Sequence, residues 1–288
     1  MEKVLVFGEH QNLVGILSEP EAGPGGLPGV LLLNAGLLHR VGPYRLYVEL
    51  ARGFEASGFH VLRFDGSGLG DSPMPRDSRD YAERSRDDII DAMDLLAEKK
   101  GIETFVLVGL CSGADNAHAV ASVDERVCGV VMLDGFTYPT LRFYLKDYAP
   151  YMINPVRLAW FVAKCLGRAV ARIIPAFGRG AGDGGDVYDR DFPPKARVAG
   201  ELGEMAGRGV RMLYIYSGGI AGYYNYAEQF TDMFKTTDFK GKLQLEYLEE
   251  ANHTYTAMSV RRHLMGIIFT WVTEYFSSEA PMYLEGTK

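Results

Sequence analysis

The sequence predicts an α/β protein whose mostly parallel sheet is covered by helices on both faces. Short apolar runs rich in Val, Ile and Leu alternate with longer segments of helical periodicity along most of the 288 residues, which is typical of such a sheet. With 47% hydrophobic and 23% charged residues, the chain has the ordinary composition of a globular protein with one large core. We therefore expect one domain with an insertion rather than two separate domains.

Eight segments are predicted to form the strands of this sheet. They are Lys3–Phe7, Leu13–Ser18, Gly29–Asn34, His60–Asp65, Thr104–Gly109, Gly129–Leu133, Met212–Ser217 and Gln244–Leu248. Helical patterns lie between and after them, at Tyr44–Ser57, Ser85–Lys99, Gly113–Ser122, Tyr226–Phe234 and Met258–Phe276. The segment from Glu19 to Leu27, rich in Gly and Pro, predicts a turn between the second and third strands.

The regular alternation stops after the sixth strand. Residues 136–207 contain helical patterns and a loop rich in Gly and Asp at 178–185, but no strand pattern. We predict a core of residues 1–135 and 208–288, with residues 136–207 inserted as a helical cap. Basic residues interrupt the apolar stretch 155–177 at helical spacings. That stretch is therefore predicted to be a packed helix or a lid over an apolar pocket, and not a transmembrane segment.

Charge and cysteine content narrow the classes of partner and site. A net charge of −7 and a pI near 5.5 give no reason to expect nucleic acid or an anionic membrane as a partner. Cys111, Cys128 and Cys165 form an odd set without metal-binding spacing, so the sequence predicts no disulfide framework, metal or cofactor. Residues 1–9 lack the features of a signal peptide, and we expect a cytoplasmic location. Whether the chain forms a homo-oligomer is left open.

The strongest motif is a nucleophile elbow at residues 109–113, Gly-Leu-Cys-Ser-Gly. It follows the predicted strand at 104–109 and precedes a predicted helix, which is the strand–turn–helix context that the motif requires. The central residue of such a turn has strained backbone geometry, so its neighbours two positions away must be very small. Gly109 and Gly113 satisfy this around Cys111. The positive end of the following helix would favour the thiolate form of that cysteine.

Ser112 is the alternative nucleophile. A turn centred on Ser112 would be flanked by Leu110 and Ala114, and the leucine would crowd it. We therefore expect the backbone N–H of Ser112, one residue after the nucleophile, to serve as an oxyanion-hole donor. Cys128 and Cys165 lie in a predicted strand and a predicted helix, and are interpreted as core residues.

His253 is the candidate base. It lies in the predicted loop at 249–255, between the last strand and the last helix, and a base at that position can reach the elbow. The other histidines fall in predicted strands, helices or loops where a structural role is the simpler interpretation.

The acid is harder to identify. The turn after the seventh strand, Ser217–Gly222, contains no carboxylate, whereas the sixth strand ends in Asp134. We therefore predict Asp134 as the acid, within hydrogen-bond reach of His253, although a turn aspartate that binds local backbone N–H groups is the simpler alternative. Glu228 is the reserve. A Cys–His dyad without an acid also remains open, because thiolate formation needs less assistance than serine activation.

The second oxyanion donor is expected in the turn after the third strand. Gly36 permits close backbone approach there, so the N–H of Leu37 or of Gly36 is predicted to complete the oxyanion hole with Ser112. Asn34 is a candidate brace for this loop. The glycines of the segment 64–72 are not a dinucleotide fingerprint, because that segment lacks the required βαβ context.

These motifs together resemble the α/β-hydrolase superfamily over essentially the whole chain. Arg-Val-Gly-Pro-Tyr-Arg at 40–45, Phe-Asp-Gly-Ser-Gly-Leu-Gly-Asp-Ser at 64–72, the elbow, and Asn-His-Thr at 252–254 are similar to hydrolases associated with bacterial exosortase systems. The Cys-centred elbow is also similar to those of dienelactone hydrolases and polyhydroxyalkanoate synthases. The resemblance implies an α/β-hydrolase fold with an eight-stranded, mostly parallel sheet. One departure is that relatives carry an aspartate near Ile220.

The resulting functional hypothesis is a cysteine-dependent acyl hydrolase acting on an ester or thioester. Cys111 attacks the carbonyl, His253 moves the proton, and Asp134 orients the imidazole. The expected substrate is a largely apolar small-molecule acyl compound, free or as a carrier-bound thioester. Two alternatives remain: an acyltransferase that uses the same site, and a non-catalytic binding protein on a hydrolase scaffold.

Overall fold

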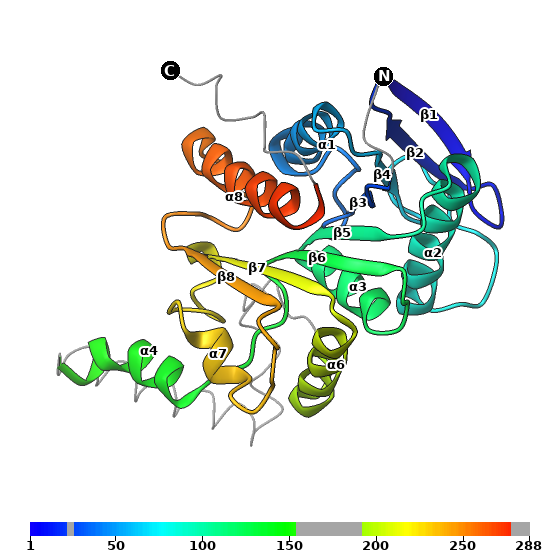
Figure 1. The fold of residues 1–288 in the computed structure, drawn as a ribbon. Helices are drawn as coiled ribbons and strands as arrows, with labels where there is room; N and C mark the ends of the chain where they lie inside the picture. Colours follow the sequence, from blue (N-terminus) through cyan, green and yellow to red (C-terminus); the bar gives the residue numbers. More distant parts are fainter. Residues whose placement is uncertain (22–25, 154–191, 278–288) are drawn as a thin grey trace, which may run out of the picture.

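The computed structural model describes residues 1–21, 26–153 and 192–277. It contains one eight-stranded sheet with the strand order β1-β2-β4-β3-β5-β6-β7-β8, drawn in Figure 1. The strands are β1 (Glu2–Phe7), β2 (Leu13–Ser18), β3 (Gly29–Leu33), β4 (Val61–Asp65), β5 (Phe105–Leu110), β6 (Val127–Leu133), β7 (Arg211–Ser217) and β8 (Leu243–Leu248). All eight predicted strands are present, which confirms the expected sheet.

The sheet is mixed but mostly parallel. β2 pairs antiparallel with both β1 and β4, and every other neighbouring pair is parallel. Every residue of β3, β4 and β5 is buried, because these central strands are covered on both faces. β3 and β5 are apolar along their length, whereas β4 buries the charged side chains of Arg63 and Asp65. The edge strand β1 is mostly exposed. The parallel strands carry their carboxyl ends to one edge, where the candidate functional residues gather.

Helices cover both faces of the sheet (Figure 1). On one face, α1 (Leu46–Ala56) and α8 (Met258–Phe276) share an apolar cluster with the sheet. On the other face, α2 (Tyr81–Lys100), α3 (Ser112–Ala121), α6 (Lys195–Arg208) and α7 (Gln229–Met233) pack into a second cluster. This doubly wound arrangement agrees with the alternating strand and helix patterns of the sequence.

Helix α2 begins four residues before the predicted start at Ser85. Asp80 is its N-cap: the Asp80 side chain accepts a hydrogen bond from the Glu83 N–H, and the Glu83 side chain accepts one from the Asp80 N–H. This capping box stabilises a first turn that carries little apolar periodicity. The periodicity alone therefore placed the start too late.

Two other predicted helices are shorter than expected. The helix predicted from Tyr44 is preceded by a 3₁₀ turn, η1 (Pro43–Arg45), in which Tyr44 and Arg45 have φ of 49° and 66°, so α1 begins only at Leu46. The helix predicted at 226–234 is reduced to α7. The Asn225 N–H donates to the Gln229 side-chain oxygen at 3.0 Å, so the first residue of α7 bonds back to the non-helical segment before it.

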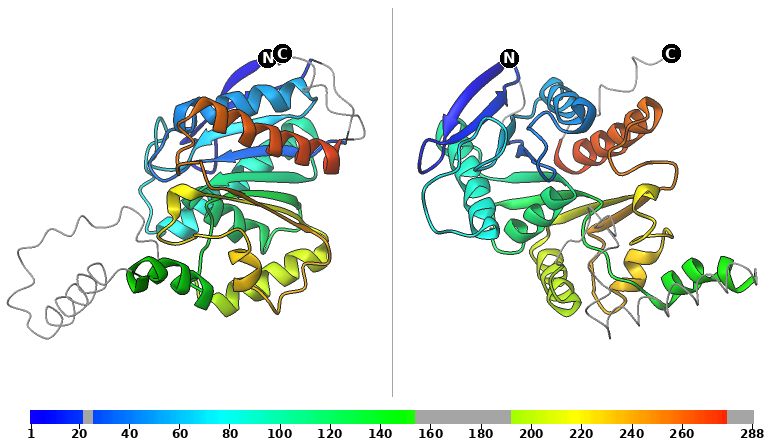
Figure 2. Two further views of the ribbon diagram at one scale, coloured as in Figure 1. Left: turned by 90° about the vertical axis from the view of Figure 1, so that its left-hand side faces the viewer. Right: turned by 180° about the vertical axis from the view of Figure 1, so that it is seen from behind.

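The predicted cap at 136–207 stays a prediction as a unit. Its residues 154–191, which include the predicted helix at 155–177, the loop at 178–185 and Cys165, lie outside the described residues. Before this gap, α4 (Leu141–Ile153) extends away from the sheet, as Figure 2 shows. After the gap, α6 buries Val198 and Leu202 in the core cluster, so this end of the insertion belongs to the helical layer that covers the sheet. None of the described helices combines the length and apolar character needed to cross a membrane.

Candidate active site

Cys111 occupies the sharp turn between β5 and α3. Its φ of 57° and ψ of −120° lie in a region that non-glycine residues rarely adopt. The flanking glycines permit the turn: a Cβ on Gly109 would lie 2.2 Å from the Gly113 carbonyl oxygen, and a Cβ on Gly113 would lie 2.5 Å from the Asn34 carbonyl oxygen. The Cys111 N–H donates to the Leu133 carbonyl at 2.8 Å. These contacts fix Cys111 at the carboxyl edge of the sheet.

His253 and Asp134 meet beside this turn. The Nδ1 atom of His253 lies 2.7 Å from an Oδ2 atom of Asp134, and the imidazole also makes a side-chain hydrogen bond with Cys111. The Asp134 side chain is fully buried, and only 12% of the His253 side chain is exposed. The structure therefore brings together the three residues that the sequence singled out on three different segments. The reserve acid, Glu228, is an exposed residue that pairs with Arg142 at 3.0 Å.

Ser217 holds the carboxylate of Asp134 from the neighbouring strand. Its backbone N–H donates to Oδ1 at 2.7 Å, and its hydroxyl donates to Oδ2 at 2.8 Å. Ser217 therefore holds both carboxylate oxygens in place, in addition to the bond from His253. Ser217 is the last residue of β7, and the turn that follows this strand, Ser217–Gly222, contains no carboxylate. Ser217 therefore holds the carboxylate of the predicted acid, Asp134, in place.

The electrostatics of His253 follow from these contacts. Burial acts to lower the pKa of the imidazole, but the hydrogen bonds and charges of Asp134 and Cys111 outweigh it and raise the pKa to about 9. A raised pKa means that the site stabilises the imidazolium form. At neutral pH the site therefore favours the protonated imidazole beside Cys111.

Tyr47 supports the elbow from below. Its buried hydroxyl accepts a hydrogen bond from the Leu110 N–H at 3.2 Å. Burial raises the pKa of Tyr47, against the effect of the Leu110 hydrogen bond, and the nearby charge of Cys111 adds to the rise. The phenol therefore stays protonated next to the turn that carries Cys111.

The predicted oxyanion loop lies against the elbow. The Gly36 N–H donates to the hydroxyl of Ser112 at 2.8 Å, so these two predicted residues are in direct contact. The Leu37 side chain is 89% exposed, and within residues 1–21, 26–153 and 192–277 the Leu37 N–H has no hydrogen-bond partner. The Ser112 N–H is at the first position of α3, where backbone N–H groups have no intrahelical acceptor.

The comparisons with known proteins agree with this geometry. A model of the alpha/beta hydrolase fold matches residues 28–160. An α/β serine hydrolase without a lid from Xanthomonas campestris is 14% identical, with a TM-score of 0.56 and coverage of 97% of both chains. An esterase from Pyrococcus furiosus is 15% identical, with a TM-score of 0.59 and coverage of 96% of this chain and 91% of that one. A search of curated protein sequences found no match.

The chain has the α/β-hydrolase fold. A further structure, an α/β serine hydrolase homologue from Coxiella burnetii, is 11% identical, with a TM-score of 0.54 and coverage of 93% of this chain and 95% of that one. At these identities the likeness concerns the fold and not the activity. Two of the three structures are described as serine hydrolases, whereas this hydrolase fold carries Cys111 at the centre of its elbow.

A buried ion pair anchors the oxyanion loop of this hydrolase fold. Asp65 at the end of β4 is fully buried and forms an ion pair with Arg40. It also accepts hydrogen bonds from the Arg40 N–H at 2.6 Å and from the Asn34 side chain at 3.2 Å. Asn34 in turn donates to the Leu38 carbonyl at 2.8 Å. The loop that carries Gly36 is therefore held at both ends.

Three side chains in this anchor have the donor set of a metal site. His39, Asp65 and Asp71 place one ligand atom each within 4.8 Å of the others. The guanidinium of Arg40 pairs with both carboxylates, at 2.8 Å in the case of Asp71, and so supplies the positive charge that a metal ion would bring. The cluster therefore fits an anchor better than a metal site.

A small cavity of about 20 Å³ opens beside His253. Its lining combines Asp134 with side chains from both ends of the inserted segment and from the loop after β7: Thr137, Phe192, Ile220 and Tyr223. Sequence reasoning did not single out these residues. The cavity is mainly apolar, has room for about one water-sized group, and does not include Cys111 in its lining.

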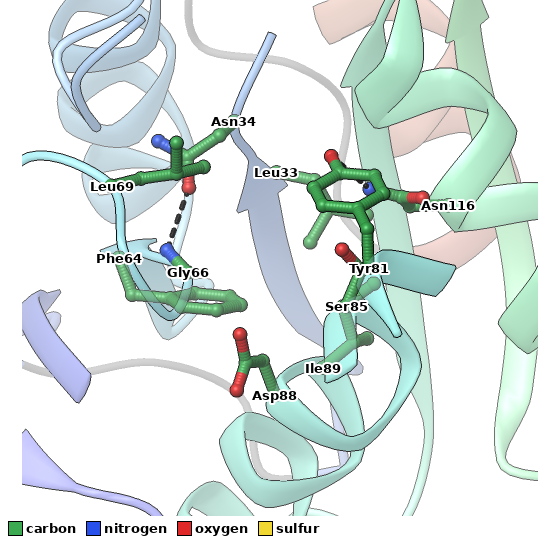
Figure 3. A pocket seen from close by; sticks show the side chains of 10 residues that line it. All are labelled: Leu33, Asn34, Phe64, Gly66, Leu69, Tyr81, Ser85, Asp88, Ile89 and Asn116. Atoms are coloured by element: carbon green, nitrogen blue, oxygen red, sulfur yellow. Dashed lines mark hydrogen bonds between the residues drawn. The ribbon is translucent and has the colours of Figure 1, made fainter. Parts of the chain in front are cut away.

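A second cavity lies on the other side of the oxyanion loop, between β3 and the start of α2. Figure 3 shows Asn34 on one wall, bonded to the Gly66 N–H at 2.9 Å, and the carboxylate of Asp88 on another. Both oxygens of Asp88 accept hydrogen bonds from Ser67, at 2.7 and 2.8 Å. Asp88 is already bonded within the chain, and Cys111 does not line this cavity. The hydrogen bonds of Asp88 therefore stabilise the loop after β4.

Proposed function

We propose that the chain is a cysteine-dependent acyl hydrolase that forms a thioacyl-enzyme on Cys111. The observation that carries this proposal is the position of His253, whose imidazole bonds to the buried carboxylate of Asp134 and also to Cys111. A nucleophile joined to a base that is oriented by a third group is the general arrangement of covalent catalysis. The elbow backbone and the fold support the same assignment.

In the first half of the reaction, the Cys111 thiolate attacks the carbonyl carbon of an ester or thioester. The carbonyl oxygen becomes an oxyanion and is stabilised by N–H donors at the start of α3 and in the loop after β3. When the carbon–oxygen or carbon–sulfur bond of the leaving group breaks, the imidazolium of His253 supplies its proton. The product is a thioacyl-enzyme and a free alcohol or thiol.

In the second half, His253 accepts a proton from a water molecule that attacks the thioacyl carbon. The bond to the Cys111 sulfur breaks, the acid is released and the thiolate is restored. An alcohol or thiol acceptor in the place of water would make the same site an acyltransferase. We extend the proposal to an acyl substrate of largely apolar character, whether free or carrier-bound, because Phe192 and Ile220 place apolar surface beside His253.

Acylation and mapping of the adduct test this proposal. A p-nitrophenyl ester and an acyl thioester are mixed with the protein, and intact mass and peptide mapping locate the acyl group. We expect the adduct on Cys111, and we expect Cys111→Ala to abolish both the adduct and turnover. Cys128→Ala is the matched control, because burial raises the pKa of that thiol to about 11 and keeps it protonated. An adduct on Ser112, or full activity of Cys111→Ala, would overturn the proposal.

A further inference from the structure

The Gly36 N–H, one of the two candidates for the second donor of the oxyanion hole, is already bonded within the protein. It donates to the Ser112 hydroxyl at 2.8 Å. That hydroxyl still has its own proton to donate, and it donates to no acceptor among the described parts of the chain, 1–21, 26–153 and 192–277. Ser112 is the residue directly after Cys111. A hydroxyl that accepts on one side and has a proton available on the other thus lies next to the nucleophile.

We propose that the Ser112 hydroxyl is itself a donor of the oxyanion hole, receiving the Gly36 N–H and donating to the oxyanion that forms on Cys111. This inference rests on the proposed function. A hydroxyl that accepts a hydrogen bond becomes a better donor, because linked hydrogen bonds polarise one another. Ser112 keeps its proton throughout, and His253 carries out the proton transfer.

The use of cysteine gives a physical reason for this donor. A carbon–sulfur bond is longer than a carbon–oxygen bond, so a tetrahedral carbon attached to Cys111 lies farther from the elbow backbone than it would on a serine. The backbone N–H groups of the turn then reach the oxyanion less well. A side-chain hydroxyl that projects from Ser112 extends the reach of the donor set.

The backbone around Ser112 fixes this hydroxyl in place. At Gly113, a Cβ would lie 2.5 Å from the Asn34 carbonyl oxygen, so the start of α3 and the end of β3 are in close contact next to the bond between Gly36 and Ser112. Asn34 accepts from the Gly66 N–H at 2.9 Å and donates to the Leu38 carbonyl. Because the start of α3 and the loop after β3 are both held in place, the hydrogen bond between Gly36 and Ser112 is a fixed part of the site.

The experiment compares two reactions of Cys111 in the wild type and in Ser112→Ala. Acylation by a p-nitrophenyl ester passes through an oxyanion, whereas alkylation by iodoacetamide does not, and reports only the thiolate. We expect Ser112→Ala to lower the acylation rate by about 10-fold to 100-fold, since removal of one oxyanion donor costs about 10²–10³ and the released Gly36 N–H replaces part of the loss. Alkylation should stay within twofold. Ser122→Ala, at the far end of α3, is the control and should change neither rate.

A spectroscopic readout separates a donor from a brace. The carbonyl stretching frequency of the acyl-enzyme should rise in Ser112→Ala, because a hydrogen bond to the acyl oxygen is lost, and Ser112→Thr should restore both the frequency and most of the rate. Unchanged acylation, an unchanged frequency, or an equal loss of alkylation would each overturn the inference. Failure of iodoacetamide to label Cys111 in the wild type would instead contradict the proposed function.

Discussion

Two buried carboxylates at the carboxyl edge of the sheet, Asp65 after β4 and Asp134 after β6, have similar surroundings and different partners. Both side chains are fully buried, and both accept backbone N–H groups, from Arg40 and Asp71 in one case and from Ser217 in the other. The permanent positive partner of Asp65 is Arg40, which is charged at every relevant pH; His39 also approaches this carboxylate, at 3.3 Å, but Arg40 lies closer to it. The partner of Asp134 is a histidine.

This difference separates a carboxylate that holds structure from one that can take part in chemistry. A permanent ion pair stabilises a loop but cannot move a proton. A carboxylate beside an imidazole sets the pKa of that imidazole and leaves it able to gain and lose a proton. The oxyanion loop is thus anchored by one kind of pair, and the proposed base is controlled by the other. Four predictions test whether the two roles are in fact distinct.

The largest expected effect is on stability, at the permanent pair. Replacing Arg40 by Met leaves the buried Asp65 charge without its partner, and we expect the free energy of unfolding to fall by about 3–5 kcal/mol. Chemical denaturation measures this free energy of unfolding. The exposed Arg52, which pairs with Glu2 at the surface, is the matched control, and its change to Met should cost under about 1 kcal/mol. Adding Asp65→Asn to Arg40→Met should restore part of the loss; no recovery would show that the charge is not the cause.

The second prediction concerns turnover at the titratable pair. In Asp134→Asn the imidazole loses its carboxylate partner, and we expect kcat to fall by about 100-fold, less than the roughly 10⁴-fold loss of a serine triad, because a thiolate depends less on a strong base. Thermal unfolding should change far less than for Arg40→Met. A fully active variant would leave Cys111 and His253 as a dyad.

The third prediction follows from the raised pKa of His253. Because the folded protein stabilises the imidazolium, this contribution is complete below the ordinary pKa of 6.5 and is lost as pH rises through about 9. We expect the free energy of unfolding to decrease by up to about 3 kcal/mol between pH 7 and pH 10, and acylation to decline above pH 9 as the proton for the leaving group is lost. His253→Gln should flatten the stability profile. If the free energy of unfolding of His253→Gln depended on pH in the same way, other groups would be the cause of the decrease.

The smallest expected effect is at Ser217. Replacing it by Ala removes the hydroxyl donor to Asp134 but keeps the backbone donor, so we expect about a 10-fold loss of kcat and about 1 kcal/mol of stability. Its specific signature is the pH profile: a less firmly held carboxylate should lower the alkaline limit of acylation. A reduced rate with an unchanged limit would mean that Ser217 acts only on packing.

The fold could be predicted because its signals are local. Most buried strands are continuous apolar runs, as in β5, and the turns between them are marked by Gly and Pro. The errors occur where a local hydrogen bond overrides periodicity, as at the Asp80 capping box and at Asn225 before α7. The first carried a recognisable Asp-x-x-Glu pattern that could have given the earlier start of α2.

The contact between Asp134 and His253 could be expected from the strand ends alone, because parallel strands bring their carboxyl ends to one edge. The role of Ser217 could not, since a serine after a strand has many uses and only its distance to Asp134 selects one. The bond between Gly36 and Ser112 depends on how closely α3 approaches β3. That approach is a property of packing, and no residue pattern encodes it directly.

The two glycines after β7 also constrain how this site could be rebuilt. A Cβ on Gly218 would lie 2.0 Å from the Glu249 carbonyl oxygen, and one on Gly219 would lie 2.2 Å from the backbone nitrogen of His253. A designer who wished to move the acid from β6 to β7 therefore could not place an aspartate at either glycine without displacing the segment that carries the histidine. An aspartate at Ile220 would bring a second carboxylate towards the same imidazole while Asp134 remains. Moving the acid therefore takes at least two coupled substitutions, an aspartate at Ile220 and the removal of Asp134. If the first is made alone, two carboxylates face the imidazole; if the second is made alone, none does.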